Sequence, residues 1–192
     1  MLSLKTATEQ RWLEQVDREL PSILIDHAHC EKKAAGAALN LIFAYGSGRG
    51  KICRELSDIV VEELEHFRLV LDLLDERGIL FCSLKPGQYG RKLNDLVRQG
   101  EPQRAIDRFL VAGLIEARSC ERFALLRDHV SDRRLADFYG SLFESEARHH
   151  SIYVQLAADF GPEQEIRGRL DELAALEAQI IRAGDELPRM HS

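Results

Sequence analysis

The sequence predicts an all-α protein built around four long helices. Apolar residues recur at intervals of three and four along most of the 192-residue chain, which is the period of a helix with one buried face. β-branched residues are sparse and nowhere alternate with polar residues over a useful length, so no strands are expected. Glycine and proline gather at a few places, which mark the helix ends.

The first half of the chain predicts a short helix and then a long helical hairpin. The short helix spans about 6–20, and Pro21 ends it because proline lacks the amide hydrogen that a helix interior requires. The second helix spans about 22–45 and stops at the glycine-rich stretch GSGRG. The third helix spans about 51–77 and ends at Gly78.

A long connection separates this hairpin from a second one. Residues 79–102 contain two prolines and three glycines, and at most a turn or two of helix, about 93–99, is expected there. A fourth long helix then covers about 103–129.

Ser131 or Asp132 is expected to cap a fifth helix that reaches Phe160, and a final helix over 163–182 precedes a polar tail that is expected to fray. Four long helices in two hairpins, joined by one long crossover connection, predict a ferritin-like four-helix bundle with extra terminal helices. Nothing in the composition suggests a second domain, so residues 1–192 are predicted to form one.

The composition is that of an ordinary globular protein, with 45% hydrophobic and 30% charged residues. No apolar run is long enough for a membrane span, and the first residues lack the apolar stretch of an export signal, so a cytoplasmic protein is expected. The four cysteines form no C-x-x-C pair and are expected to be reduced packing residues. A net charge of −6 argues against broad coating of nucleic acid but allows a local basic surface.

A glutamate interrupts the apolar face of each long helix near its middle. In two of the helices a histidine follows at the spacing Glu-x-x-His, so that both side chains project from one face. Other residues compete in these stretches, Glu62 and Glu65 in the first and Glu144 and His150 in the second, but they do not continue the apolar stripe. The predicted inward set is Glu31, Glu63, His66, Glu116, Glu146 and His149.

This set predicts a site for two divalent metal ions. An ionised carboxylate in a bundle core costs several kcal/mol unless it is paired or binds metal. Two divalent cations would balance four carboxylates while both histidines bind as neutral imidazoles. The residue types, and their positions on four helices, are those of di-iron carboxylate bundles, and a carboxylate-rich site suits iron or manganese better than copper or zinc.

Five other residues are weaker candidates for the site. Asp26 and His29 repeat the spacing near a helix start, where capping or exposure is expected. Tyr153 and Cys120 are expected to be core packing residues, and His150 is expected to point away from the core.

The chain also resembles a known family, the bacterial tRNA hydroxylases that act on 2-methylthio-N6-isopentenyladenosine. The similarity covers most of the chain and is strongest in DHAHCEKKAAGAALNLI (26–42), SDIVVEELEHF (57–67), LIEARSCERF (114–123) and ESEARHHSIYVQLA (144–157). LIEARSCERF is the most specific, because generic di-iron bundles do not share it.

The resemblance implies an O2-dependent di-iron monooxygenase with the same six ligands and two iron ions. It would hydroxylate the isopentenyl group of the modified adenosine next to the anticodon of tRNA. Electrons would come from a separate reductase or ferredoxin-type donor, since the chain has no flavin or iron–sulfur motif.

Two basic stretches are candidates for contact with tRNA, although the same residues could simply solvate loops. Tyr89, in the connection, could stack on a base. The connection and its flanks contribute Lys85, Arg91, Lys92, Arg98 and Arg104, and the glycine-rich turn contributes Arg49, Lys51 and Arg54.

Two other functions fit the helical pattern. A ferritin-like iron-storage or peroxide-detoxifying protein would use the same fold and a similar metal site. A metal-free helical interaction module would need no metal, but its four core glutamates would then destabilise the fold.

Overall fold

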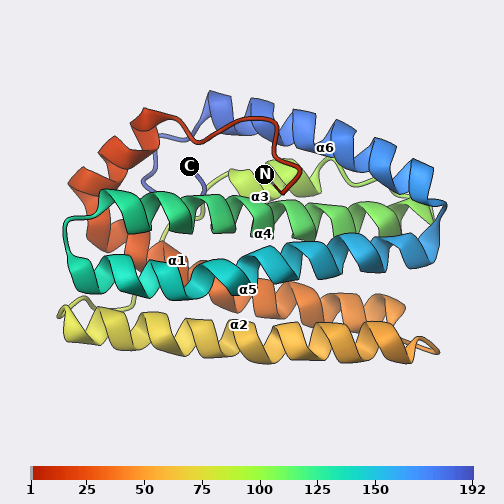
Figure 1. Ribbon diagram of the computed structural model, residues 1–192, viewed down its shortest axis with the longest axis horizontal. Helices are drawn as coiled ribbons and strands as arrows, with labels where there is room; N and C mark the ends of the chain where they lie inside the picture. The colour runs from red at the N-terminus through yellow and green to blue at the C-terminus, as the bar shows by residue number, and fades with distance from the viewer. Residues whose placement is uncertain (1) are drawn as a thin grey trace. The chain divides into compact units, whose positions relative to one another are not determined.

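The computed structural model describes residues 2–192, and these residues form helices and no strands, which confirms the all-α prediction (Figure 1). None of these helices combines the length and apolar character that crossing a bilayer requires. The elements are α1 (Gln10–Tyr45), α2 (Gly50–Glu76), α3 (Tyr89–Asn94), α4 (Gln103–His129), α5 (Arg133–Ala157), the short 3-10 helix η1 (Ala158–Phe160) and α6 (Glu163–Ala183).

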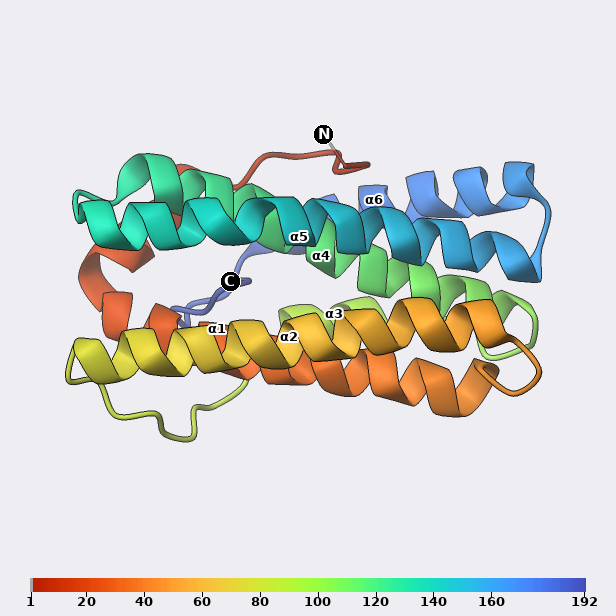
Figure 2. The ribbon, with the colours of Figure 1, turned by 60° about the horizontal axis from the view of Figure 1, so that its bottom comes forward.

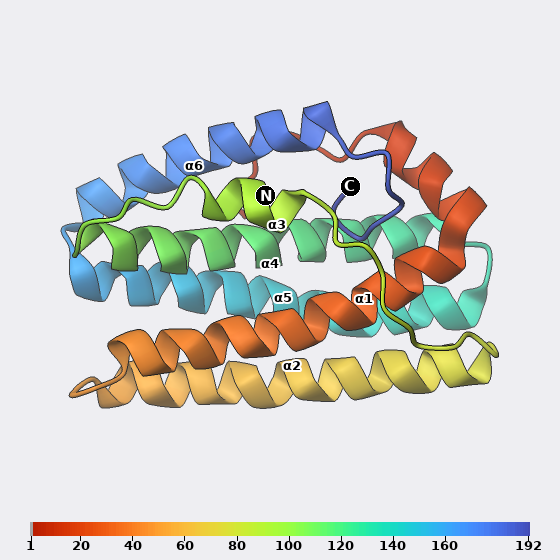
Figure 3. The ribbon, with the colours of Figure 1, turned by 180° about the vertical axis from the view of Figure 1, so that it is seen from behind.

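The described chain forms two compact units. The first, which we call the α1–α2 unit, comprises residues 14–87, 185–190 and 192; the second, the α4–α5 unit, comprises residues 2–13, 88–184 and 191. Each unit contains one hairpin of two long helices, seen from opposite sides in Figures 1 and 3.

In the α1–α2 unit, the predicted break at Pro21 is a kink inside one helix. Helix α1 begins at Gln10 rather than residue 6 and continues through Pro21, with non-helical dihedral angles at Glu19 (φ −135°, ψ 36°). Proline removes one helical hydrogen bond and its ring collides with the carbonyl four residues earlier, so the backbone bends just before it. The chain then resumes the helix, because Ile23 and Leu24, directly after the kink, are fully buried in the core.

The connection leaves the end of α2, which lies beside α1 (Figure 2). Gly78 ends α2 as predicted and has a φ of 64°, in the left-handed region that glycine adopts without strain. The short helix α3 starts at Tyr89, earlier than the predicted 93–99, because Tyr89 and Leu93 are the residues that this turn buries.

In the α4–α5 unit, α4 spans the predicted residues, and Asp132 rather than Ser131 caps α5. The Asp132 carboxylate accepts hydrogen bonds from the backbone amides of Arg134 (2.9 Å) and Leu135 (3.2 Å). Arg118 of α4 and Glu177 of α6 form a fully buried ion pair of 2.8 Å. Arg118 also donates to the carbonyl oxygen of Thr6 (3.1 Å), so one side chain fastens both α6 and the N-terminal segment to α4.

The C-terminal tail is ordered, and the expectation that it frays is wrong. Met190 is 1% exposed and its amide donates to a carboxylate oxygen of Asp26 at 2.9 Å. The Arg189 guanidinium donates to the carbonyl oxygen of Lys85 at 2.6 Å. These bonds within the α1–α2 unit give the polar tail fixed partners that its sequence pattern does not reveal.

Candidate metal centre

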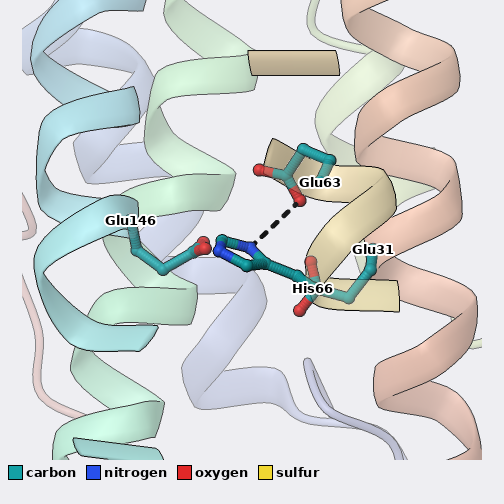
Figure 4. A group of neighbouring side chains, drawn as sticks. All are labelled: Glu31, Glu63, His66 and Glu146. Carbon is teal, nitrogen blue, oxygen red and sulfur yellow. Dashed lines mark ion pairs between the residues drawn. The ribbon is translucent and has the colours of Figure 1, made fainter. Parts of the chain in front are cut away.

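The α1–α2 unit presents a buried triad of two carboxylates and one imidazole. Glu31 extends from α1, and Glu63 and His66 extend from adjacent turns of α2 (Figure 4). One ligand atom from each lies within 4.8 Å of the other two, and His66 Nδ1 lies 3.9 Å from Glu63 Oε2. The three residues are at most 7% exposed. We call them the α1–α2 triad.

The α4–α5 unit presents a second triad of the same composition. Glu116 lies on α4, while Glu146 (also drawn in Figure 4) and His149 lie one turn apart on α5. Their ligand atoms also lie within 4.8 Å of one another, and all three residues are at most 4% exposed. We call them the α4–α5 triad.

The apolar stripes explain why these side chains face inward. On α2, the buried positions Ile59, Glu63, His66 and Val70 follow one another at intervals of three and four. The competing Glu65 is exposed. On α5, Glu146 and His149 continue a stripe in the same way, and the competing Glu144 is exposed.

Each triad is compatible with metal binding. Its two carboxylates carry a formal charge of −2, which one divalent cation balances. Carboxylate oxygens and an imidazole nitrogen are the donors that iron and manganese accept, and no thiolate lies among them. Because buried carboxylates are costly without a cation, the donor set fits the metal that the sequence predicts.

His27 is a residue of this site that the sequence analysis missed. It lies one turn before Glu31 on α1, is fully buried, and its Nε2 contacts Glu31 Oε1. Burial lowers the pKa of His27 to about 3, and the nearby Asp26 and Glu63 offset this only in part. The ring is therefore neutral at physiological pH, and an Nε2–H can donate to Glu31. The spacing His-x-x-x-Glu on a buried helix face is the sequence pattern that could have indicated this contact.

His150 lies in the core, and the expectation that it points away is wrong. It is 6% exposed, and its Nδ1 lies 2.7 Å from the carbonyl oxygen of Gly113 on α4. Burial lowers the pKa of His150 although that hydrogen bond raises it. A Cβ on Gly113 would lie 3.3 Å from Tyr153 Cβ. Helices α4 and α5 thus approach closely beside His149. This close approach buries a wider face of α5 than a single apolar stripe.

The other weak candidates also have defined places. Asp26 is buried rather than capping or exposed, because it accepts the Met190 amide described above. His29 donates to the carbonyl oxygen of Cys82 at 2.9 Å. Tyr153 and Cys120 are core residues as predicted, each 1% exposed, and burial raises the pKa of the Cys120 thiol to about 11.

Comparison with known proteins decides the family. The model of the tRNA-(MS2IO6A)-hydroxylase family (MiaE) matches residues 2–192. The chain belongs to the MiaE family. It is therefore an enzyme of the hydroxylase class, as the sequence predicts.

Curated relatives of the MiaE family support this assignment. The chain is 40% identical over 185 residues to tRNA 2-(methylsulfanyl)-N(6)-isopentenyladenosine(37) hydroxylase of Pseudomonas putida, covering 96% of this chain and 89% of the relative. It is 31% identical over 237 residues to the Salmonella typhimurium protein of the same name, covering 98% of this chain and 87% of that relative.

A solved structure confirms the ferritin-like fold. Protein 43 with aldehyde deformylating oxygenase activity, from Synechococcus, superposes with a TM-score of 0.93 and 45% sequence identity. The match covers 98% of this chain and 95% of the other. The fold class predicted from helix count and connection length is thus correct.

The structure shows which of the basic candidates for tRNA contact are exposed and which are held by other residues. Arg98 donates to Asp107 at 2.8 Å, and Arg169 donates to the same carboxylate at 2.8 Å. Burial would raise the pKa of Asp107, but these hydrogen bonds outweigh it and the pKa is lowered. Tyr89 is buried and donates to Glu177 at 3.1 Å, so it is not available for stacking. Of the remaining basic candidates, Lys92 is half-buried. The others are exposed: Lys85, Arg91, Arg104, Arg49, Lys51 and Arg54.

Proposed function

We propose that the α1–α2 and α4–α5 triads together hold two iron ions in a single domain spanning residues 1–192. Glu31, Glu63 and His66 would serve one side of the centre, and Glu116, Glu146 and His149 the other. The observation that supports this most strongly is the presence of two buried Glu-Glu-His triads of equal composition. Their total formal charge of −4 equals what two divalent cations neutralise.

We further propose that the enzyme uses O2 to hydroxylate the isopentenyl group of 2-methylthio-N6-isopentenyladenosine next to the anticodon of tRNA. A bound di-iron centre would supply the O2 reduction that such a hydroxylation needs. The reaction consumes one O2, two electrons and two protons, inserts one oxygen atom into a C–H bond and releases the other as water. Both curated relatives carry the name of this hydroxylase, which favours it over iron storage or peroxide removal.

The protein's own residues would orient ligands and exclude water. His27 would hold one oxygen of Glu31 and leave the other directed to the metal. Ile59 and Val70 on α2, and Leu142 and Tyr153 on α5, bracket the triads by one turn on either side, and all four are buried. Such buried neighbours would keep water from the reacting atoms.

The remaining partners follow from this activity. The two electrons would come from a separate reductase or ferredoxin-type protein, because the sequence contains no flavin or iron–sulfur motif. A tRNA substrate would place the enzyme in the cytoplasm. The modified base is unpaired in the anticodon loop, so it can enter a pocket without melting a duplex.

The ligand set is tested by metal analysis of the full chain purified without chelators. About two irons per chain are expected, and Glu116→Ala should abolish loading. Ser119→Ala, one turn away on α4, serves as the matched control and should load normally. Full loading of Glu116→Ala would show that the proposed ligands are wrong.

A second activity is favoured by one observation, the 45% identity to the Synechococcus protein with aldehyde deformylating oxygenase activity. The same centre could act on an aldehyde instead of a prenylated nucleoside. Equal amounts of reduced protein, given O2 and either a long-chain aldehyde or the modified tRNA, would separate the two. We expect a hydroxylated nucleoside and no hydrocarbon; hydrocarbon and formate from the aldehyde alone would favour the second activity.

A further inference from the structure

The turn between α1 and α2 presents an exposed basic surface with an exposed aromatic ring. Arg49, Lys51 and Arg54 are exposed, and Phe43, on the last turns of α1, is 77% exposed. We call these four residues the hairpin-tip surface. It lies at the end of the two long helices where α1 passes into α2 (Figure 3).

The sign of the charge here is opposite to that of the chain. Residues 32–54 contain five cations and no acidic residue, while the whole chain carries a net charge of −6. Acidic residues of α2 begin only at Glu55. A local positive surface can attract a polyanion even when the net charge of the protein is negative.

The turn holds these side chains in a defined place. A Cβ on Gly46 would lie 2.6 Å from the carbonyl oxygen of Ile42 and 2.7 Å from Cys53 Sγ, so only glycine fits. Gly48 has a φ of 74°, in the left-handed region. The amide of Arg49 donates to the Gly46 carbonyl at 2.9 Å. A turn fixed in this way loses little conformational entropy when its side chains bind a partner.

An exposed face of α1 leads from the hairpin tip toward the α1–α2 triad. Lys32, Leu39 and Phe43 are separated by seven and four residues and so lie on one face of the helix. All three are exposed, Leu39 by 42%. Phe43 is twelve residues from Glu31, or about 18 Å along the axis at 1.5 Å per residue. That length equals about five nucleotides of a stacked strand at 3.4 Å each.

Resting on the proposed function, we propose that the hairpin-tip surface binds tRNA about five nucleotides from the modified adenosine. Arg49, Lys51 and Arg54 contact phosphates, and Phe43 stacks on an unpaired base. The other basic candidate, the connection, is less suited because its aromatic residue, Tyr89, is buried, whereas Phe43 is exposed. The hairpin tip thus combines the two features that bind nucleic acid, phosphate-directed cations and a ring with an open face.

The test compares two triple variants that remove the same charge. Arg49→Gln/Lys51→Gln/Arg54→Gln alters the hairpin tip, and Lys85→Gln/Arg91→Gln/Arg104→Gln alters the connection and its flank. Binding of the metal-loaded full chain to tRNA that carries 2-methylthio-N6-isopentenyladenosine is measured between 50 and 200 mM salt. Circular dichroism and iron content establish that each variant is folded.

We expect the hairpin-tip triple to bind about 100-fold more weakly at 100 mM salt, with a slope of log K against log salt shallower by about 2, because each phosphate contact contributes ~0.7–0.9. The connection triple should stay close to wild type. Phe43→Ala should weaken binding at least about 5-fold with an unchanged slope, because base stacking does not release counterions. Leu80→Ala, at a residue 81% exposed in the same unit, is its control.

Equal losses for the two triples, or a loss confined to the connection triple, would overturn the hairpin-tip proposal while leaving the tRNA activity intact. The hairpin-tip triple could instead bind tRNA normally and lose turnover only when a protein supplies the electrons. That result would assign the surface to the electron donor. A wild-type protein that does not bind tRNA would overturn the proposed function as well.

Discussion

Replacing His27 tests whether a buried imidazole orients the Glu31 carboxylate for metal. His27 is fully buried and Glu31 is 4% exposed, so water cannot take over the contact that His27→Phe removes. A hydrogen bond to a charged group is worth ~1.5–3 kcal/mol. At 1.36 kcal/mol per decade this predicts metal binding weaker by about 10- to 150-fold.

The assay is competition between the full chain and a chelator of known affinity for Fe(II) under anaerobic conditions. His27→Gln serves as the conservative variant, because its amide nitrogen can occupy the place of Nε2 and should keep most of the affinity. His29→Phe, two residues along the same helix, is the matched control and should bind as wild type does. Wild-type affinity in His27→Phe would show that His27 does not orient Glu31 for metal, and equal losses in both phenylalanine variants would point to a general effect on α1.

Three further predictions concern stability. Asp107→Asn should lower the free energy of unfolding at pH 7 by about 3 kcal/mol, because it breaks a buried ion cluster. The pKa of Asp107 is lowered in the folded protein, so its stabilisation is present above pH 3.8 and is lost as the pH falls through the folded pKa. The difference between variant and wild type, measured by urea denaturation, should therefore shrink toward pH 3. Gly113→Ala should destabilise the protein by about 1 kcal/mol in the same assay, because the crowding of its Cβ against Tyr153 at 3.3 Å outweighs the gain in helix propensity; a higher melting temperature would contradict this. Removing metal with a chelator should lower stability by about 2.7 kcal/mol or more when free metal had been 100-fold above Kd, and restoring Fe(II) should reverse it; an unchanged melting temperature would argue against a metal in the core.

The buried positions of the six proposed ligands could be predicted because periodicity and chemistry conflict at those positions. A carboxylate on an apolar stripe, as at Glu63 and Glu146, breaks the pattern that its neighbours follow. The rule worked where a single stripe defines the buried face. It failed for His150, because close approach at Gly113 buries a wider face of α5 than the stripe predicts.

Features that depend on distant partners could not be predicted. Arg189 donates a hydrogen bond to the carbonyl oxygen of Lys85, 104 residues away in sequence. Arg169 donates to the carboxylate of Asp107, 62 residues away. Neither pair has a local pattern, so the order of the tail could not be predicted, and neither could the ion cluster that holds Arg98, a candidate for contact with tRNA. Pro21 shows a different limit, because a proline predicts where a helix bends but not whether the chain resumes it.

The most direct test of the proposed function is a single turnover with labelled oxygen. Anaerobically reduced protein is mixed with ¹⁸O2 and tRNA carrying 2-methylthio-N6-isopentenyladenosine, and the nucleosides are analysed by mass spectrometry. We expect one ¹⁸O atom in the isopentenyl group, and loss of this product in Glu63→Ala. An unchanged nucleoside from protein that contains two reduced irons per chain would contradict the proposed function.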